Sequence, residues 1–209
     1  SAGARTEVRL SLALARSWSG ALAEALAEYD ALIAEDPSNL RARKGRAEIL
    51  GWMERHESAA SELRQALALA PGDRDLQRRL ARTESYRGRH RTAVALARPL
   101  LAADPADEEA ALIIAESERW MGRPDSAIET IGTLLRAAPD NERALKLRGE
   151  IERDLRPFTE VRAYGSTQSD NLGIWSTSIR QGFTLNGGRT SLGAQYQHLA
   201  FEPDTGRGV

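Results

Sequence analysis

A proline recurs every 34 residues through most of the sequence, at Pro37, Pro71, Pro105 and Pro139. Two alanine series keep the same spacing: Ala13, Ala47, Ala81 and Ala115 form one, and Ala25, Ala59, Ala93 and Ala127 form the other. A fixed period of this length is typical of an array in which each unit buries its apolar face only against its neighbours. The spacing therefore predicts a repeat array over this part of the chain.

Each recurring residue has a mechanical reason. A proline cannot continue a helix, so it closes the second helix of each unit. Alanine fits where the two helices of a unit cross closely, which accounts for both alanine series. An asparagine or aspartate follows each proline by two residues, where it can cap the first helix of the next unit; these residues are Asn39, Asp73, Asp107 and Asn141. We therefore expect about nine antiparallel helices, two from each unit.

With unit starts at Thr6, Leu40, Arg74, Glu108 and Glu142, the segment resembles the tetratricopeptide repeat (TPR) family, whose period is about 34 residues. The resemblance covers Thr6 to Asp154, as four full repeats and the first helix of a fifth. Two residues depart from it: Arg46 stands where the family usually has leucine, and Gly149 replaces an alanine in the last helix. The resemblance implies a right-handed superhelix whose first helices line a concave binding groove that performs no chemistry.

The composition narrows the classes of function. The chain has 209 residues and a formal net charge of -1, so no overall basic field points to nucleic acid as a partner. It has no cysteine, which excludes disulfides, thiolate metal sites and a cysteine nucleophile. The sequence contains no glycine-rich phosphate loop, nucleophile elbow or paired-carboxylate motif. We therefore expect a protein that is not an enzyme and needs neither a cofactor nor a metal.

One position of the repeat carries a large ring in every full unit, at Trp18, Trp52, Tyr86 and Trp120. This position lies near the end of the first helix, towards the groove. Two interpretations are open: the rings form a ladder on which sugar or peptide groups stack, or each ring seals one repeat against the next. Burying a tryptophan stabilises a fold by roughly 2–3 kcal/mol. We favour sealing, because a residue repeated in every unit is more often architectural than specific to a ligand.

Basic residues accompany the rings at groove positions. The candidate binding residues are Trp52, Arg78, Arg82, Tyr86, Arg119, Trp120, Arg143 and Lys146. Acidic residues lie among them, so the groove carries both signs of charge; they include Glu48, Asp75, Glu109, Glu116 and Glu150. A charged polymer held by the arginines would bind more weakly with added salt. His56 and His90 occupy equivalent positions beside the turn between helices, and without ligands at metal spacing we interpret them as surface turn residues.

After Asp154 the sequence becomes rich in Gly, Ser, Thr and aromatic residues, and the apolar period changes to two. The predicted fold class is therefore mainly α, with a TPR α-solenoid over residues 1–156 and antiparallel β-strands over residues 157–209. The predicted strands are Phe158 to Tyr164, Ile174 to Leu185 and Arg189 to Phe201. Residues 186–188 have the sequence Asn-Gly-Gly, which predicts a hairpin turn because these residues tolerate positive φ.

The two long predicted strands each have one apolar face and one small, polar face. Long strands of this kind, with rings near their ends, are typical of an outer-membrane β-barrel. In that interpretation the array lies in the periplasm, the loop Gly165 to Gly173 lies outside, and further strands follow Val209, since about eight are the minimum. The alternative is a small soluble sheet packed against the last helix of the array.

Repeats with a tryptophan before a Gly-Arg turn, as in ERWMGRPDSAIE, followed by such strands resemble bacterial outer-membrane proteins of the YaiO type. They are also similar to the export porins for cellulose and poly-N-acetylglucosamine. This resemblance implies an outer-membrane location with a periplasmic TPR scaffold that docks periplasmic or envelope proteins for exopolysaccharide export, with the exopolysaccharide as a further partner. The alternative is a general TPR scaffold for protein partners, with a soluble sheet and no role in export.

Overall fold

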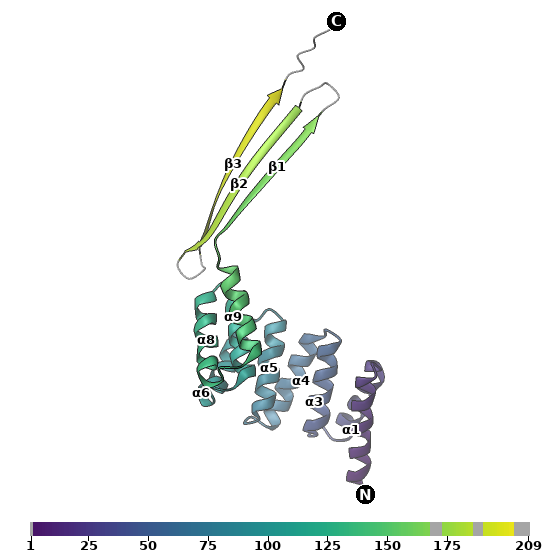
Figure 1. Cartoon of the computed structure of the whole chain (residues 1–209). Helices are drawn as coiled ribbons and strands as arrows, with labels where there is room; N and C mark the ends of the chain where they lie inside the picture. Colours follow the sequence, from purple (N-terminus) through teal and green to yellow (C-terminus); the bar gives the residue numbers. More distant parts are fainter. Residues whose placement is uncertain (1, 168–172, 186–189, 203–209) are drawn as a thin grey trace.

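The chain forms a curved stack of helices followed by an antiparallel sheet, as Figure 1 shows. The computed structural model describes residues 2–167, 173–185 and 190–202. Within them lie nine helices: α1 (Ala2–Trp18), α2 (Leu22–Glu35), α3 (Leu40–Trp52), α4 (His56–Leu69), α5 (Arg74–Tyr86), α6 (His90–Ala103), α7 (Glu108–Trp120), α8 (Pro124–Ala137) and α9 (Glu142–Asp154). The predicted solenoid of repeated helix pairs, ending in a single helix, is confirmed.

Side-chain caps start the first helix of each repeat from the second onwards. The side-chain oxygen of Asn39 accepts a hydrogen bond from the backbone N–H of Ala42 at 3.0 Å. Asp73, Asp107 and Asn141 cap α5, α7 and α9 in the same way, at 3.1, 3.1 and 2.9 Å. Each cap satisfies one of the backbone donors that a helix start leaves unpaired. The four predicted caps are therefore confirmed.

The core is a row of clusters rather than one interior. One cluster joins α1, α2 and α3, and the next joins α3, α4 and α5. A third joins α5, α6 and α7, and a fourth joins α7, α8 and α9. The alanines of both predicted series are buried at these crossings. Because α9 covers the last cluster as a following repeat would, a half repeat is enough to close the apolar face of the fourth unit.

Arg46, which stands where the family usually has leucine, lies in an ion-pair network. Its Nε lies 2.6 Å from Asp30, and its Nη1 binds Glu62. Arg43 binds the same buried Glu62 carboxylate from the other side. A buried carboxylate is tolerated only where cations and hydrogen bonds compensate its charge. The arginine at position 46, where the family usually has leucine, is therefore compensated by the carboxylate of Glu62 on α4.

The turn within each repeat needs a residue with positive φ. Gly20, Gly88 and Gly122 adopt φ of 84°, 72° and 69° there. In the second repeat the corresponding residue is Glu54, with φ 58°. Glycine enters this region without steric cost, whereas the Cβ of other residues crowds the following carbonyl oxygen. The second repeat therefore carries backbone strain that the other three avoid.

The sheet contains β1 (Phe158–Thr167), β2 (Gly173–Leu185) and β3 (Thr190–Glu202), in the order β1-β2-β3 with antiparallel pairing. The three predicted strands are confirmed, and each extends beyond one of its predicted ends. The described strands form an open sheet and not a closed barrel. The predicted turn at residues 186–188 lies outside the described residues, as do residues 168–172 of the predicted external loop.

The register of the sheet places the apolar positions of neighbouring strands opposite one another. Ile179 of β2 is paired with Val161 of β1 and with Tyr196 of β3. The Val161 and Ile179 side chains are 63% and 44% exposed. The sheet extends away from the end of α9 (Figure 1), so the described residues do not form the packing against the last helix that the soluble-sheet alternative requires. Among the described residues, no helix packs over these two apolar side chains.

Candidate interaction groove

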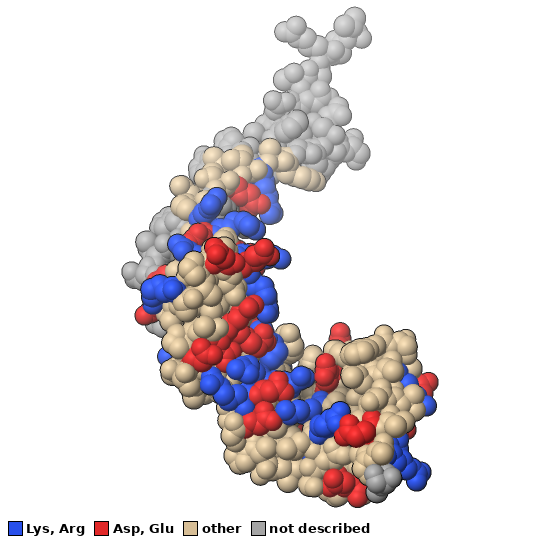
Figure 2. Space-filling model, turned by 60° about the horizontal axis from the view of Figure 1, so that its bottom comes forward, with Lys and Arg blue, Asp and Glu red and all other residues tan. Residues whose placement is uncertain are grey.

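The candidate binding residues all lie on the first helices of the repeats. Trp52 is on α3, three of the residues are on α5, and the rest are on α7 and α9. Neighbouring first helices such as α5 and α7, or α7 and α9, touch each other, so these side chains form one surface. We call it the groove face. Figure 2 shows Lys and Arg side chains interleaved with Asp and Glu side chains in a continuous band along the hollowed side of the array.

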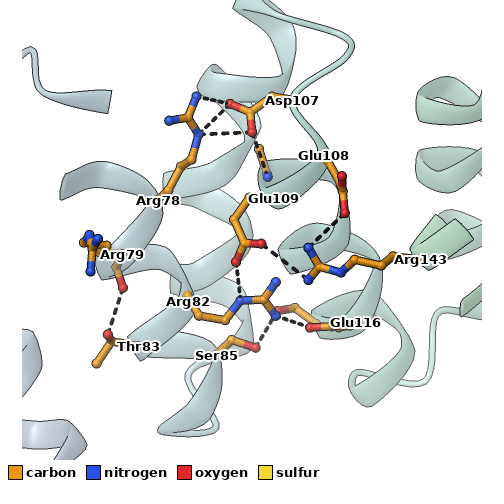
Figure 3. Close-up of polar contacts among 12 residues, drawn as sticks. Arg78, Arg79, Arg82, Thr83, Ser85, Asp107, Glu108, Glu109, Glu116 and Arg143 are labelled. Atoms are coloured by element: carbon orange, nitrogen blue, oxygen red, sulfur yellow. Dashed lines mark hydrogen bonds and ion pairs between the residues drawn. The ribbon is translucent and has the colours of Figure 1, made fainter. Parts of the chain in front are cut away.

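Arginines of the groove face are bound by carboxylates of the next repeat. Arg78 of α5 donates to both oxygens of Asp107, with Nε at 3.1 and 2.8 Å. Arg82, one turn further along α5, binds Glu109 at 2.7 Å and also Glu116. Figure 3 shows both guanidinium groups directed at α7 and the residue that caps it. These pairs join residues that are 27 to 34 positions apart in the chain.

The same pattern continues to the last helix. Arg143 of α9 binds Glu108 of α7 at 2.8 Å (Figure 3). Arg119 of α7 lies 3.2 Å from Glu150 and also binds Asp154 of α9. Each of these arginines therefore links one repeat to the next, and its charge is compensated within the array. The groove face does not offer them as free cations to a charged polymer.

The electrostatics of these arginines follow from their partners. The hydrogen bond to Asp107 raises the pKa of Arg78, against a smaller opposing effect of desolvation. Desolvation is the largest influence on the pKa of Arg82 and opposes its charge, but Glu109 and Glu116 together outweigh it and the pKa is raised. Both side chains are therefore held in their cationic form. Their role in the array is structural as well as electrostatic.

Lys146 differs from the arginines. It lines a cleft of about 210 Å³ between α7 and α9, together with Glu116 and Glu150. Among the described residues, the Lys146 ammonium group forms no ion pair and no hydrogen bond; the neighbouring Glu116 and Glu150 bind arginines instead. Of the predicted basic groove residues, Lys146 is therefore the one whose charge is available to a ligand.

The rings of the repeat are exposed. Trp18, Trp52, Tyr86 and Trp120 have relative exposures of 75%, 47%, 63% and 77%. A ring that sealed two repeats would be buried between them, so our favoured interpretation of the stripe as a seal is wrong. The exposed rings leave the stacking interpretation open.

Two histidines lie against rings of the following repeat. His56 of α4 lies 5.6 Å from Tyr86, between ring centroids, and His90 of α6 stacks on Trp120 at 6.2 Å with the planes 3° apart. Interpreting the histidines as surface turn residues missed this contact. The signal was present in the sequence, because each histidine precedes its ring by the same number of residues (86 − 56 = 30 and 120 − 90 = 30). The described residues contain no cluster of side chains that could hold a metal ion.

A cavity of about 570 Å³ opens on the groove face between α3 and α5. Trp52 and Tyr86 stand at its wall, and Gly51 and Leu63 line it as well. Arg82 also lines it, with its guanidinium carbon 5.9 Å from the centre of the Tyr86 ring. Nη2 of Arg82 is buried and has no hydrogen-bond partner among the described residues. The structure thus brings Trp52, Arg78, Arg82 and Tyr86 together at one site, whereas Arg143 and Lys146 line a different cleft.

Comparison with known proteins finds a family match for part of the helical array. Residues 86–151 match the family model described as tetratricopeptide repeat. No curated protein matches the chain significantly. Among the helices of the described part, none combines the length and the hydropathy needed to cross a membrane.

Solved structures resemble the array at low sequence identity. MamA 41-end from Desulfovibrio magneticus RS-1 has a TM-score of 0.64 at 14% identity, covering 71% of this chain and 84% of that one. YrrB, described as a TPR protein with an unusual peptide-binding site, has a TM-score of 0.57 at 20% identity, covering 70% and 75%. The thermophilic TPR protein TTC0263 from Thermus thermophilus has a TM-score of 0.57 at 24% identity, covering 72% and 81%. These likenesses concern the fold.

Proposed function

We propose that this chain, part of which matches the tetratricopeptide repeat model, is an interaction scaffold that binds an extended segment of a partner protein along its groove face. The observation that carries the proposal is the stripe of exposed rings on consecutive first helices. Large apolar side chains that stay exposed at regular positions mark a surface where a partner binds, because covering them is favourable. The scaffold acts by binding alone, without a catalytic residue or a cofactor.

The charge pairing supports a protein partner over a polyanion. The arginines beside the rings already bind carboxylates of the next repeat, so a strongly charged polymer would have to displace those contacts. An uncharged or mixed peptide segment would instead use the rings and leave the pairs intact. The peptide-binding site named for YrrB, which shares the fold, is consistent with this mode of recognition.

Peptide selection tests the scaffold. A random peptide library displayed on phage is selected against the intact protein, and the selected peptides are measured by fluorescence anisotropy. We expect the variant with Trp52→Ala, Tyr86→Ala and Trp120→Ala to bind them at least about tenfold more weakly, since exposed rings carry interface energy. The control is Leu69→Ala, which truncates an exposed side chain on α4. Equal affinity in the two variants, or no selected peptide, would contradict the proposal.

We further propose that the sheet is the start of an outer-membrane barrel, with residues 1–156 as its periplasmic domain and residues 157–209 as its membrane part. The strands have 10, 13 and 13 residues, and crossing a bilayer as a tilted β-strand takes about 9–11 residues. The exposed Val161 and Ile179 would contact lipid, and both outer strands would pair with further strands. The array would then dock envelope proteins for exopolysaccharide export.

Vesicle binding tests the membrane proposal. The intact protein is sedimented with vesicles of phosphatidylethanolamine and phosphatidylglycerol. Ile179→Asp should reduce the bound fraction strongly, because a charge on the lipid-facing side is unfavourable. Ser178→Asp puts the same charge on the opposite face of β2 and should reduce binding less. If the protein stays a monomer without detergent and does not sediment with the vesicles, attachment to the outer membrane through the sheet is excluded.

A separate titration tests whether exopolysaccharide is a partner. Oligosaccharides of cellulose and of poly-N-acetylglucosamine are added while tryptophan emission is followed. Saturable quenching that disappears in Trp120→Ala, with an unchanged melting temperature, would support sugar stacking on the exposed ring. Emission that does not change with either sugar would leave the scaffold with protein partners alone.

A further inference from the structure

We infer that the cavity between α3 and α5 is a pocket for one large, uncharged apolar side chain of the bound segment, together with the backbone carbonyl beside it. The inference rests on the proposed function, because it assigns a specific subsite on the groove face. Its volume of about 570 Å³ lies within the usual range for small-ligand sites, roughly 300–1,000 Å³. The cavity is therefore large enough for an aromatic or branched aliphatic side chain.

Gly51 contributes open space to the pocket. No heavy atom beyond its immediate chain neighbours and local helix backbone lies within 4 Å of the position that a Cβ of residue 51 would take. In the next repeat the corresponding residue is Ser85, whose hydroxyl lies 3.1 Å from that of Ser117 and closes the contact between α5 and α7. In agreement, α5 and α7 approach each other more closely than α3 and α5 do. The missing side chain thus leaves open space between the second and third repeats.

The walls of the pocket suit an apolar group. Trp52 and Tyr86 flank it from neighbouring repeats, and Leu63 lines it from α4. His56 also lines the pocket and lies against the Tyr86 ring, which limits the orientations of that ring before any ligand arrives. Side chains that are already ordered lose little freedom on binding, which favours affinity.

One polar atom of a residue that lines the pocket lacks a partner. Nε and Nη1 of Arg82 are engaged by Glu109 and Glu116, while Nη2 is buried without an acceptor among the described residues. A buried donor without an acceptor is unfavourable. A carbonyl oxygen of the ligand, placed beside the inserted side chain, would satisfy it. This donor is the feature that selects a peptide-like ligand over a plain hydrocarbon.

The charges of the pocket select a neutral ligand. Three arginines and three carboxylates line it, and each arginine pairs with at least one carboxylate; the six residues are Arg78, Arg79, Arg82, Glu48, Asp75 and Glu109. A ligand carboxylate would meet three acidic groups, and a ligand cation would meet three basic groups. Neither sign is favoured, so the inserted side chain is uncharged.

The probe for this pocket is N-acetyl-phenylalaninamide, which joins an uncharged ring to amide carbonyls. Binding to the intact protein is followed through the indole N–H resonance of Trp52, assigned with a Trp52→Phe variant. We expect a saturable shift of that resonance, with the other tryptophan resonances unaffected. N-acetyl-alaninamide, which lacks the ring, and N-acetyl-phenylalanine, which carries a carboxylate, should each bind at least about tenfold more weakly.

Two matched variants locate the site. Gly51→Leu fills the open space and should weaken binding of the probe at least about tenfold, with an unchanged circular dichroism spectrum. Gly149→Leu makes the same change in α9, also where a Cβ would meet no atom within 4 Å, and should leave binding unchanged. Equal binding by wild type and Gly51→Leu would overturn the assignment, as would the absence of a saturable shift.

A third variant tests the unpaired donor. Arg82→Lys keeps the charge but removes the guanidinium donors, and should weaken binding of the probe. Toluene, which has the ring but no carbonyl, should bind wild type and Arg82→Lys equally. An equal loss for the probe and for toluene would contradict the role of the donor, because it would mean that the variant had changed the shape of the pocket.

The outcomes separate this inference from the proposed function. Selected peptides that bind Gly51→Leu as well as wild type would leave the scaffold intact and remove the pocket as their subsite. A probe that shifts Trp52 in a protein that selects no peptide would keep the pocket and contradict the scaffold.

Discussion

The array and the sheet differ in what happens to their apolar side chains. In the array, residues such as Ile113 and Ile131 are completely buried against the next helix. In the sheet, Val161 and Ile179 are aligned across neighbouring strands and are exposed. Both regions have regular, hydrogen-bonded secondary structure. The difference lies in what packs on the apolar face. In the array, neighbouring helices cover it, whereas no described element covers the apolar face of the sheet.

This contrast shows that secondary structure and burial have separate causes. A helix pair of the array always has a neighbour on which its apolar face can pack, so each unit stabilises the next. A sheet satisfies its backbone through strand pairing, but its apolar face needs a second layer, a membrane or a partner. The stability of the array should therefore depend on its own core, and that of the sheet on what covers it.

The largest expected effect is the truncation of a buried array residue. Ile131→Ala should lower the free energy of unfolding by about 2–5 kcal/mol, because it leaves a cavity in a closed cluster. Ile179→Ala in the sheet should change it by less than about 1 kcal/mol, since this residue is exposed and no described helix packs on it. Urea unfolding followed by helical circular dichroism measures both. Similar losses for the two variants would mean that the regions are coupled.

Overpacking should be the next largest effect. Ala93→Leu places a larger side chain where α6 crosses its neighbours, and should cost about 1–3 kcal/mol. Ser61→Leu adds the same side chain on the exposed side of α4 and should change stability little. Thermal melting of the two variants tests the repeat register. A larger loss from the serine variant would show that the crossing is not at residue 93.

The turns of the array provide a test with the opposite sign. Glu54→Gly should stabilise the protein by about 1 kcal/mol, because it relieves a left-handed backbone conformation that disfavours a Cβ. Gly88→Ala introduces that strain in the next repeat and should destabilise by about 1–2 kcal/mol. The difference is measured by chemical denaturation. Changes of the same sign in both variants would contradict the assignment of strain.

The exposed rings of the array resemble Val161 and Ile179 of the sheet, because all of them are apolar side chains at the surface. Trp120→Ala should cost less than about 1 kcal/mol in spite of the size of the ring, because most of it remains in water. Tyr29→Ala removes a buried ring from the first cluster and should cost about 3–5 kcal/mol. Melting temperatures compare the two. If the Trp120 variant is as unstable as the Tyr29 variant, the ring of Trp120 does seal neighbouring repeats.

The smallest expected effect depends on pH. The hydrogen bond from Lys44 lowers the pKa of Asp73, and its capping contact with Leu76 adds to this. A depressed folded pKa contributes stability above the ordinary aspartate pKa of about 3.9, and that stability is lost as pH falls through the lower folded value. Asp73→Asn keeps a capping side chain but loses the ion pair, so it should cost at most about 1 kcal/mol at neutral pH. The gap between wild type and variant should narrow as pH falls below the ordinary aspartate pKa and close once Asp73 is protonated in the folded protein; a gap that persists in strong acid would exclude the ion pair as its cause.

The sequence by itself determined the elements. The proline and alanine periods, the caps at Asn39 and Asp107, and the change to period two all act over a few residues, and local rules describe them well. It also predicted that the groove residues share one set of helices, because a fixed period repeats each position on the same face. The exposure of Trp120 was predicted wrongly, since the same pattern serves a buried and an exposed ring.

Only the tertiary structure decided how neighbouring repeats meet. The spacing between first helices leaves the Trp52 and Tyr86 rings exposed, lets Arg78 reach Asp107 in the next repeat, and opens a cavity beside Gly51. These distances depend on how tightly each pair of units packs, which no window of neighbouring residues records. The same holds for the sheet, whose strands follow from alternation while the covering of its apolar face depends on a layer outside them.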